Sequence, residues 1–151
     1  MISTLANRDP RLTARRTACT LGFAGLLPFV VCSALLWWGP PAALLAAKVL
    51  TAYALAILCF LCGSWWGIGL LRGSAAPLLW SNALVVLAVA AFSLLPSRAV
   101  AGLLSLGLAF SWWFEGWHPV FRRQPPYYRR LRTALTLVAL CALLLALPYL
   151  P

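Results

Sequence analysis

Long apolar stretches, each sufficient for a membrane-crossing helix, occupy most of this 151-residue chain. A hydrocarbon core about 30 Å thick requires about 20 helical residues, and the stretches are separated by short breaks rich in Pro, Gly or Arg. The alternating ten-residue segments that are typical of a membrane β-barrel do not occur in the sequence. The pattern predicts an all-α, polytopic membrane protein with one domain of five transmembrane helices. Its predicted parts are a basic tail at 1–17 and spans at about 18–38, 42–71, 77–95, 99–117 and 131–147.

Composition supports this class and limits the kind of partner. Hydrophobic residues make up 64% of the chain and charged residues only 9%, which is too few charges for the surface of a soluble domain of this length. A net charge of +10 would normally raise nucleic acid as a partner. Here the charges lie in groups beside apolar spans, which is typical of the cytoplasmic segments that flank membrane helices. We therefore expect the lipid bilayer, and not nucleic acid, to be the partner.

The distribution of the basic residues predicts the orientation. With the N-terminus in the cytoplasm, only Lys48 and Arg98 lie on the outer side, against ten arginines on the inner side. Such a bias is typical of cytoplasmic loops, so we predict a cytoplasmic N-terminus and a periplasmic C-terminus. The inner arginines are Arg8, Arg11, Arg15, Arg16, Arg72, Arg122, Arg123, Arg129, Arg130 and Arg132.

Three of the predicted spans have distinct features. The first contains Gly22, Gly25 and Pro28, which predict a bend or a close approach between helices. The second would be about 45 Å long as one helix, so we expect it to tilt or protrude from the membrane. The third span, 77–95, is short, and a re-entrant segment is the alternative to a full crossing.

A stripe of small residues follows one face of the second span. Its members recur at spacings of four, three, four and four residues, which places them on one side of a helix. In lipid, such a stripe lets two backbones approach closely. Packing inside the bundle is the favoured interpretation, and a homodimer face remains open. The predicted helix-packing residues are Ala52, Ala56, Cys59, Gly63 and Gly67.

The chain supplies few groups for catalysis or metal binding. Cys59 and Cys62 have the spacing of a redox motif, but a thiol in apolar surroundings is inert. His118 is the only His, whereas zinc usually takes three or four protein ligands and bis-His haem takes two. Asp9, the only Asp, lies in the tail, so no Ser-His-Asp set is credible. We expect no metal, no cofactor and no enzymatic activity.

Glu115 is the only acid outside the tail. A carboxylate at membrane depth is costly unless it is paired, and Arg72 and Arg132 stand at about the same depth. A structural ion pair is the favoured interpretation, because a proton or ion relay needs several ionisable groups in series. The predicted inner-face polar cluster comprises Arg72, Glu115, His118 and Arg132.

A basic and aromatic loop, PVFRRQPPYYRRLR at 119–132, precedes the last span. Each basic group near an anionic leaflet contributes about 1 kcal/mol of attraction. The loop is therefore predicted to contact anionic phospholipid, with a purely topology-setting role as the alternative. The predicted contacts are Arg122, Arg123, Tyr127, Tyr128, Arg129 and Arg130.

Three sequence blocks resemble a known family. They are LGFAGLLPF at 21–29, FLCGSWWGIGL at 60–70 and PYYRRLRTALT at 126–136. Their order is similar to that in domain-of-unknown-function family 3429, the bacterial relatives of eukaryotic transmembrane protein 69. The sequence departs from the family pattern at Cys62, Trp65 and Tyr127, where Gly, His and Trp are expected. The resemblance implies a small multi-pass protein of the bacterial inner membrane and supplies no activity.

Three functions are compatible with these features. The first is a non-catalytic accessory or scaffold subunit that packs against other membrane subunits, in a respiratory or assembly complex, or against itself. The second is a small transporter or channel with a polar site near Glu115. The third is a site for lipid or quinone between the helices. A transporter would need its polar residues to converge, and these are Ser64, Asn82, Ser111 and Glu115.

Overall fold

The computed structural model describes residues 10–38 and 40–150, and every regular element in these ranges is helical. Five helical segments of the described chain are long and apolar enough to cross a membrane, which confirms the predicted polytopic class. The helices are α1 (Pro10–Ala24), α2 (Leu27–Trp38), α3 (Pro40–Arg72), α4 (Ala75–Leu94), α5 (Ser97–Trp117), the 3-10 turn η1 (Pro119–Phe121), α6 (Pro126–Ala146) and the 3-10 turn η2 (Leu147–Tyr149).

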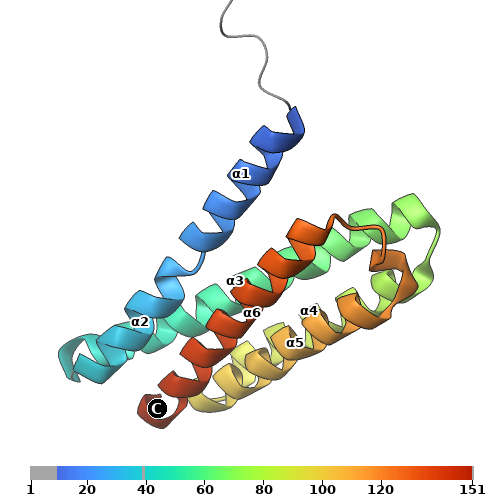
Figure 1. The fold of residues 1–151 in the computed structure, drawn as a ribbon. Coiled ribbons are helices and arrows are strands. Elements are labelled where there is room, and N and C mark those ends of the chain that lie inside the picture. The colour runs from blue at the N-terminus through green and yellow to red at the C-terminus, as the bar shows by residue number, and fades with distance from the viewer. Residues whose placement is uncertain (1–9, 39, 151) are drawn as a thin grey trace, which may run out of the picture.

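The spans run up and down in chain order, so that consecutive spans are antiparallel (Figure 1). α1 and α2 together form the first span, Leu12–Trp38. α1 begins at the end of the bundle where α3 ends and α6 begins, and the C-terminus lies at the other end. We call the end of the bundle where α1 begins the Arg-rich end, because Arg72, Arg122 and Arg129 lie there.

The bend expected in the first span is a complete break at Gly25 and Leu26. Pro28 lacks an N–H group, and its ring would clash with the carbonyl four residues earlier, so a continuous helix is interrupted here. The carbonyl of Gly25 accepts a hydrogen bond of 2.8 Å from the hydroxyl of Tyr53 on α3. The ring of Phe29 also packs edge-on against Tyr53. α3 thus stabilises the break. On the N-terminal side of the break, α1 leans away from α3 (Figure 1).

The turn between α3 and α4 is closed by a left-handed glycine. Gly73 has a φ of +60°, a conformation that side-chain-bearing residues rarely adopt. The Ser74 N–H donates to the Gly69 carbonyl and the Gly73 N–H to the Leu70 carbonyl, which is the Schellman arrangement for ending a helix. The chain reverses here, in the break predicted between the spans 42–71 and 77–95.

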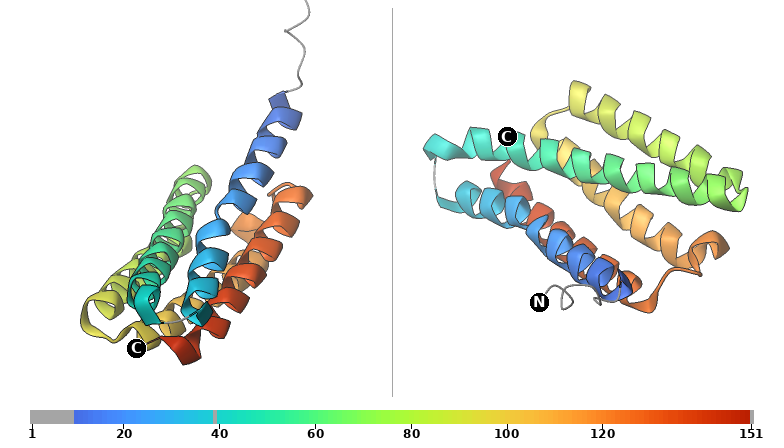
Figure 2. Two further views of the ribbon diagram at one scale, coloured as in Figure 1. Left: turned by 90° about the vertical axis from the view of Figure 1, so that its left-hand side faces the viewer. Right: turned by 90° about the horizontal axis from the view of Figure 1, so that it is seen from above.

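α3 is the central helix of the bundle. It contacts α2, α4 and α5, with α4 on one side and α1 and α2 on another (Figure 2). Its buried face is formed mainly by Ala47, Leu50, Ala54 and Leu58, which pack in the largest apolar core. A second core at the Arg-rich end comprises Trp65, Phe114 and Phe121. These two cores position the polar residues described below.

Several boundaries differ from those predicted. α1 begins at Pro10, so the part of the basic tail that the structure describes is helical. α6 begins at Pro126, because a proline is well suited to the first turn of a helix, and the second half of the predicted basic loop is therefore helical. α4 is one uninterrupted helix of 20 residues, which is long enough to cross the membrane fully.

Candidate functional site: a buried ion pair at the Arg-rich end

Glu115 on α5 and Arg132 on α6 form an ion pair. The Nε of Arg132 donates to Oε2 of Glu115 over 3.2 Å, and both side chains are more than nine-tenths buried. A buried charge left alone would be costly, so the pairing predicted from the sequence has a clear physical basis. This is the one salt bridge among the described residues.

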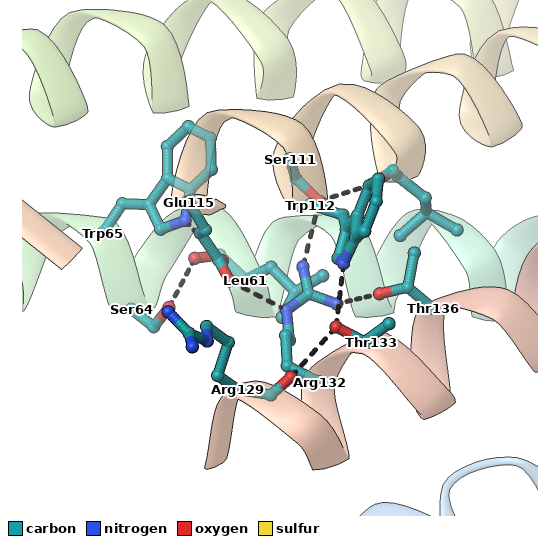
Figure 3. A network of polar contacts seen from close by, with 11 residues as sticks. Leu61, Ser64, Trp65, Ser111, Trp112, Glu115, Arg129, Arg132, Thr133 and Thr136 are labelled. Atoms are coloured by element: carbon teal, nitrogen blue, oxygen red, sulfur yellow. Dashed lines mark hydrogen bonds and ion pairs between the residues drawn. The ribbon is translucent and has the colours of Figure 1, made fainter. Parts of the chain in front are cut away.

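The remaining part of the guanidinium of Arg132 is held by two hydroxyl groups (Figure 3). Its Nη1 donates to Oγ1 of Thr136 over 2.6 Å, and its Nη2 donates to Oγ of Ser111 over 3.0 Å. Ser111 lies one helical turn before Glu115, and Thr136 lies one turn after Arg132. The spacing of four residues on each helix therefore presents these four side chains to one another.

Trp65 of α3 completes the environment of the carboxylate. Its indole Nε1 donates to Oε1 of Glu115 over 2.8 Å, so each carboxylate oxygen has a donor. The Trp65 ring is fully buried, with ring centroids 4.8 Å from Phe114 and 5.7 Å from Phe121. The pair thus joins α3, α5 and α6. Neither Trp65 nor Thr136 is among the site residues predicted from the sequence. A buried indole N–H requires an acceptor, and Glu115 is the one acid in a span, but the sequence does not indicate which tryptophan is buried.

Two of the four residues of the predicted polar cluster, Arg72 and His118, do not take part in this network. Arg72 is exposed at the end of α3, where it lines a shallow depression with Pro119 and Arg123. The side chain of His118 caps η1, since its Nδ1 accepts from the Val120 N–H over 3.3 Å. Its ring stacks on Phe114. His118 thus takes part in capping and ring packing, and it makes no hydrogen bond to Glu115 or Arg132 in the part of the chain that the structure describes.

The small-residue stripe of α3 does not pack inside the bundle, contrary to the favoured interpretation. A Cβ atom added at Gly63 or at Gly67 would meet nothing within 4 Å. Ala52 and Ala56 are exposed and Cys59 is half-buried. A different face of α3, which includes Ala47, Leu50, Ala54 and Leu58, packs in the core instead. The stripe faces outward.

The predicted lipid-contacting residues are divided among several surroundings. Arg122 and Arg129 line a pocket between α5 and α6. The guanidinium of Arg15 lies over the ring of Tyr127, with its Cζ 5.4 Å from the ring centroid. This contact brings the first turns of α1 next to the start of α6. Tyr128 is half-buried and lines an apolar cavity. Arg123 is exposed beside Arg72, and Arg130 is exposed in a depression that it shares with Arg129 and Thr133.

Two cavities meet at Arg132. The pocket between α5 and α6 has a volume of about 460 Å³ and contains arginine and tryptophan side chains. The apolar cavity has a volume of about 360 Å³, and most of its lining comes from α1, α3 and α6. Arg132 belongs to the lining of both. Glu115 lines only the pocket between α5 and α6, so both members of the ion pair border that pocket and Arg132 alone borders the apolar cavity.

The arrangement is built to hold helices together. The five cysteines are free thiols, and no group of three or more metal-ligating side chains occurs within 10–38 and 40–150. In the same ranges, no buried side-chain nitrogen or oxygen lacks a hydrogen-bond partner. A network whose buried polar atoms are all paired gives rigidity and fixes the register of the helices.

Comparisons with known proteins identify a family but no individual relative. Neither the search of curated proteins nor the search of solved structures found a match. The family model described as "Protein of unknown function (DUF3429)" matches residues 14–148, which confirms the resemblance drawn from the three sequence blocks, and the chain belongs to that family.

Proposed function

We propose that this multi-pass membrane protein is a non-catalytic accessory subunit of the bacterial inner membrane. In this proposal its N-terminus is cytoplasmic, and α3 packs against a transmembrane helix of another subunit. The observation that carries the proposal is the outward orientation of the small-residue stripe, Ala52, Ala56, Cys59, Gly63 and Gly67. Because the stripe is not used inside the bundle, its close-packing surface is free for a helix from elsewhere.

The polar residues give less support to a small transporter. The hydroxyl of Ser64 donates to the Leu61 carbonyl and the amide of Asn82 to the Leu78 carbonyl, each on its own helix. Glu115 has a donor on each oxygen. A transport path needs polar groups that converge on a cavity and exchange partners, and these side chains are occupied locally.

The test of the accessory role combines crosslinking with two leucine substitutions. A photo-crosslinking residue at Ala56, in native membranes, should yield one adduct with a defined membrane polypeptide. Gly63→Leu should abolish that adduct, because its side chain fills the space needed by the partner helix. Gly102→Leu is the matched control, since a Cβ at Gly102 also meets nothing within 4 Å, and it should retain the adduct.

Two results would contradict the accessory role. An adduct of twice the mass of this chain would assign the face to a homodimer. A crosslink that survives Gly63→Leu unchanged would show that the stripe does not carry the contact.

A second candidate function is the binding of an apolar lipid or quinone tail between helices. The cavity bordered by α1, α3 and α6 favours it, with Tyr128 and Thr136 as polar members of an otherwise apolar lining. Organic extraction of the purified protein should recover an amphiphile above its bulk membrane fraction. Ala18→Phe, which fills the cavity from α1, should remove this enrichment. A bulk-like lipid composition in the wild type would exclude this function.

A further inference from the structure

The pocket between α5 and α6 carries positive charge that no carboxylate neutralises. Glu115 is the only acid among the described residues, and its oxygens are occupied by Trp65 and Arg132. Arg122 and Arg129, which line the pocket, are exposed and have no acidic partner within 10–38 and 40–150. The two arginines come from separate segments. Arg122 directly follows η1, and Arg129 lies in the first turn of α6. Guanidinium groups are well suited to bind phosphate oxygens, so two of them on one pocket favour an anionic ligand of this kind.

The wall of the pocket is fixed by hydrogen bonds. The indole Nε1 of Trp112 donates to Oγ1 of Thr133 over 3.0 Å, which links α5 to α6. The same Thr133 hydroxyl donates to the Arg129 carbonyl over 3.0 Å (Figure 3). The backbone that carries Arg129 is therefore held relative to the tryptophan. A pre-formed site loses less conformational entropy when a ligand binds.

The surroundings of the pocket are those of a membrane interface. Trp112, Trp113 and Trp117 line it, and the last two rings stack nearly parallel, with centroids 5.8 Å apart. Half-exposed tryptophans are typical of the level of the lipid headgroups. Exposed apolar side chains continue from the pocket along both helices toward the middle of the membrane. Leu106 lies two turns before Trp113, and Leu137 lies one turn after Thr133.

We propose that this pocket binds the phosphate group of an anionic phospholipid, between Arg122 and Arg129, with the acyl chains along the exposed leucines of α5 and α6. The tryptophan rings cover the glycerol region. This site is independent of the proposed subunit contact, which uses a different helix, α3. Of the predicted lipid contacts, the site assigns Arg122 and Arg129 to the phosphate group and excludes Arg123, which lines a separate depression with Arg72.

The experiment is a lipid titration of the full chain in mild detergent. Phosphatidylglycerol is added, and binding is followed by tryptophan fluorescence and by the number of lipids retained in native mass spectrometry. Phosphatidylcholine tests the need for net negative charge, and glycerol 3-phosphate tests whether the acyl chains matter. Arg122→Gln/Arg129→Gln is compared with Arg72→Gln/Arg123→Gln, which removes the same charge from exposed positions that line a separate depression.

The proposal expects saturable binding of phosphatidylglycerol that becomes about 10- to 30-fold weaker in Arg122→Gln/Arg129→Gln. The control variant should bind within about threefold of the wild type, because screened surface charges contribute little. Equal weakening by the two variants would show a diffuse basic surface and overturn the site. Binding of phosphatidylcholine or of glycerol 3-phosphate as tight as that of phosphatidylglycerol would overturn the assignment to an anionic lipid.

Discussion

The indole N–H of Trp65 and the carboxylate of Glu115 are joined by a hydrogen bond of 2.8 Å between residues 50 positions apart in the chain. The bond links the central helix to the α5–α6 pair at the level of the second core. Trp66, the next residue, is exposed and makes no such contact. Two adjacent tryptophans therefore have different roles, one in holding the ion pair and one at the outer surface.

Trp65→Phe should lower the free energy of unfolding by about 1–3 kcal/mol, because a buried carboxylate oxygen loses its donor. Trp66→Phe is the matched control and should change stability by less than about 0.5 kcal/mol, as is usual for exposed positions. Unfolding in mixed micelles with increasing denaturing detergent measures both. Equal effects of the two substitutions would show that the hydrogen bond does not stabilise the fold.

A double-mutant cycle on Glu115 and Arg132 should reveal strong coupling. Arg132→Met leaves Glu115 as an unpaired buried acid, and Glu115→Gln leaves an unpaired guanidinium, so each should cost about 3 kcal/mol. The double variant should regain much of this loss, since neither charge is then buried alone. Additive losses in the double variant would contradict an ion pair that acts as a unit.

Two glycines should respond in opposite ways to enlargement. A Cβ at Gly107 would lie 3.0 Å from Cδ2 of the buried Leu58, so Gly107→Leu should destabilise the protein by about 1–3 kcal/mol through overpacking. Gly63→Leu has open space and should leave the unfolding of the isolated protein unchanged or slightly improved, because Gly is a poor helix former. Thermal unfolding of both variants in one detergent makes the comparison. Destabilisation of the isolated protein by Gly63→Leu would contradict the outward orientation of the stripe.

Tyr53→Phe should loosen the break between α1 and α2. The substitution removes the donor to the Gly25 carbonyl but keeps the ring against Phe29. We expect a loss of about 1 kcal/mol, as for a single neutral hydrogen bond, with faster amide hydrogen exchange confined to the residues around Gly25. Exchange that rises equally throughout α3 would indicate a global effect instead.

The sequence predicted the spans well because apolar runs and Pro or Gly breaks determine where helices in lipid begin and end. It also predicted that Glu115 pairs with an arginine, since a single membrane acid requires a partner, but it left Arg72 and Arg132 as equal candidates. It could not decide which face of α3 turns inward. In lipid both Gly63 and Leu58 are compatible with an exposed position, so hydropathy does not separate core from surface. For the same reason it did not distinguish Trp65 from Trp66, or exclude Arg72 and His118 from the polar network.

Glu115 and Arg132 belong to consecutive helices, and this has a consequence for biosynthesis. Only η1 and a short loop separate α5 from α6, so the two charges can meet within a helical hairpin without the other spans. A carboxylate or a guanidinium entering lipid alone is costly, whereas a neutralised pair is less so. Insertion of α5 is therefore favoured once α6 has emerged from the ribosome, and the two spans enter the bilayer as one unit.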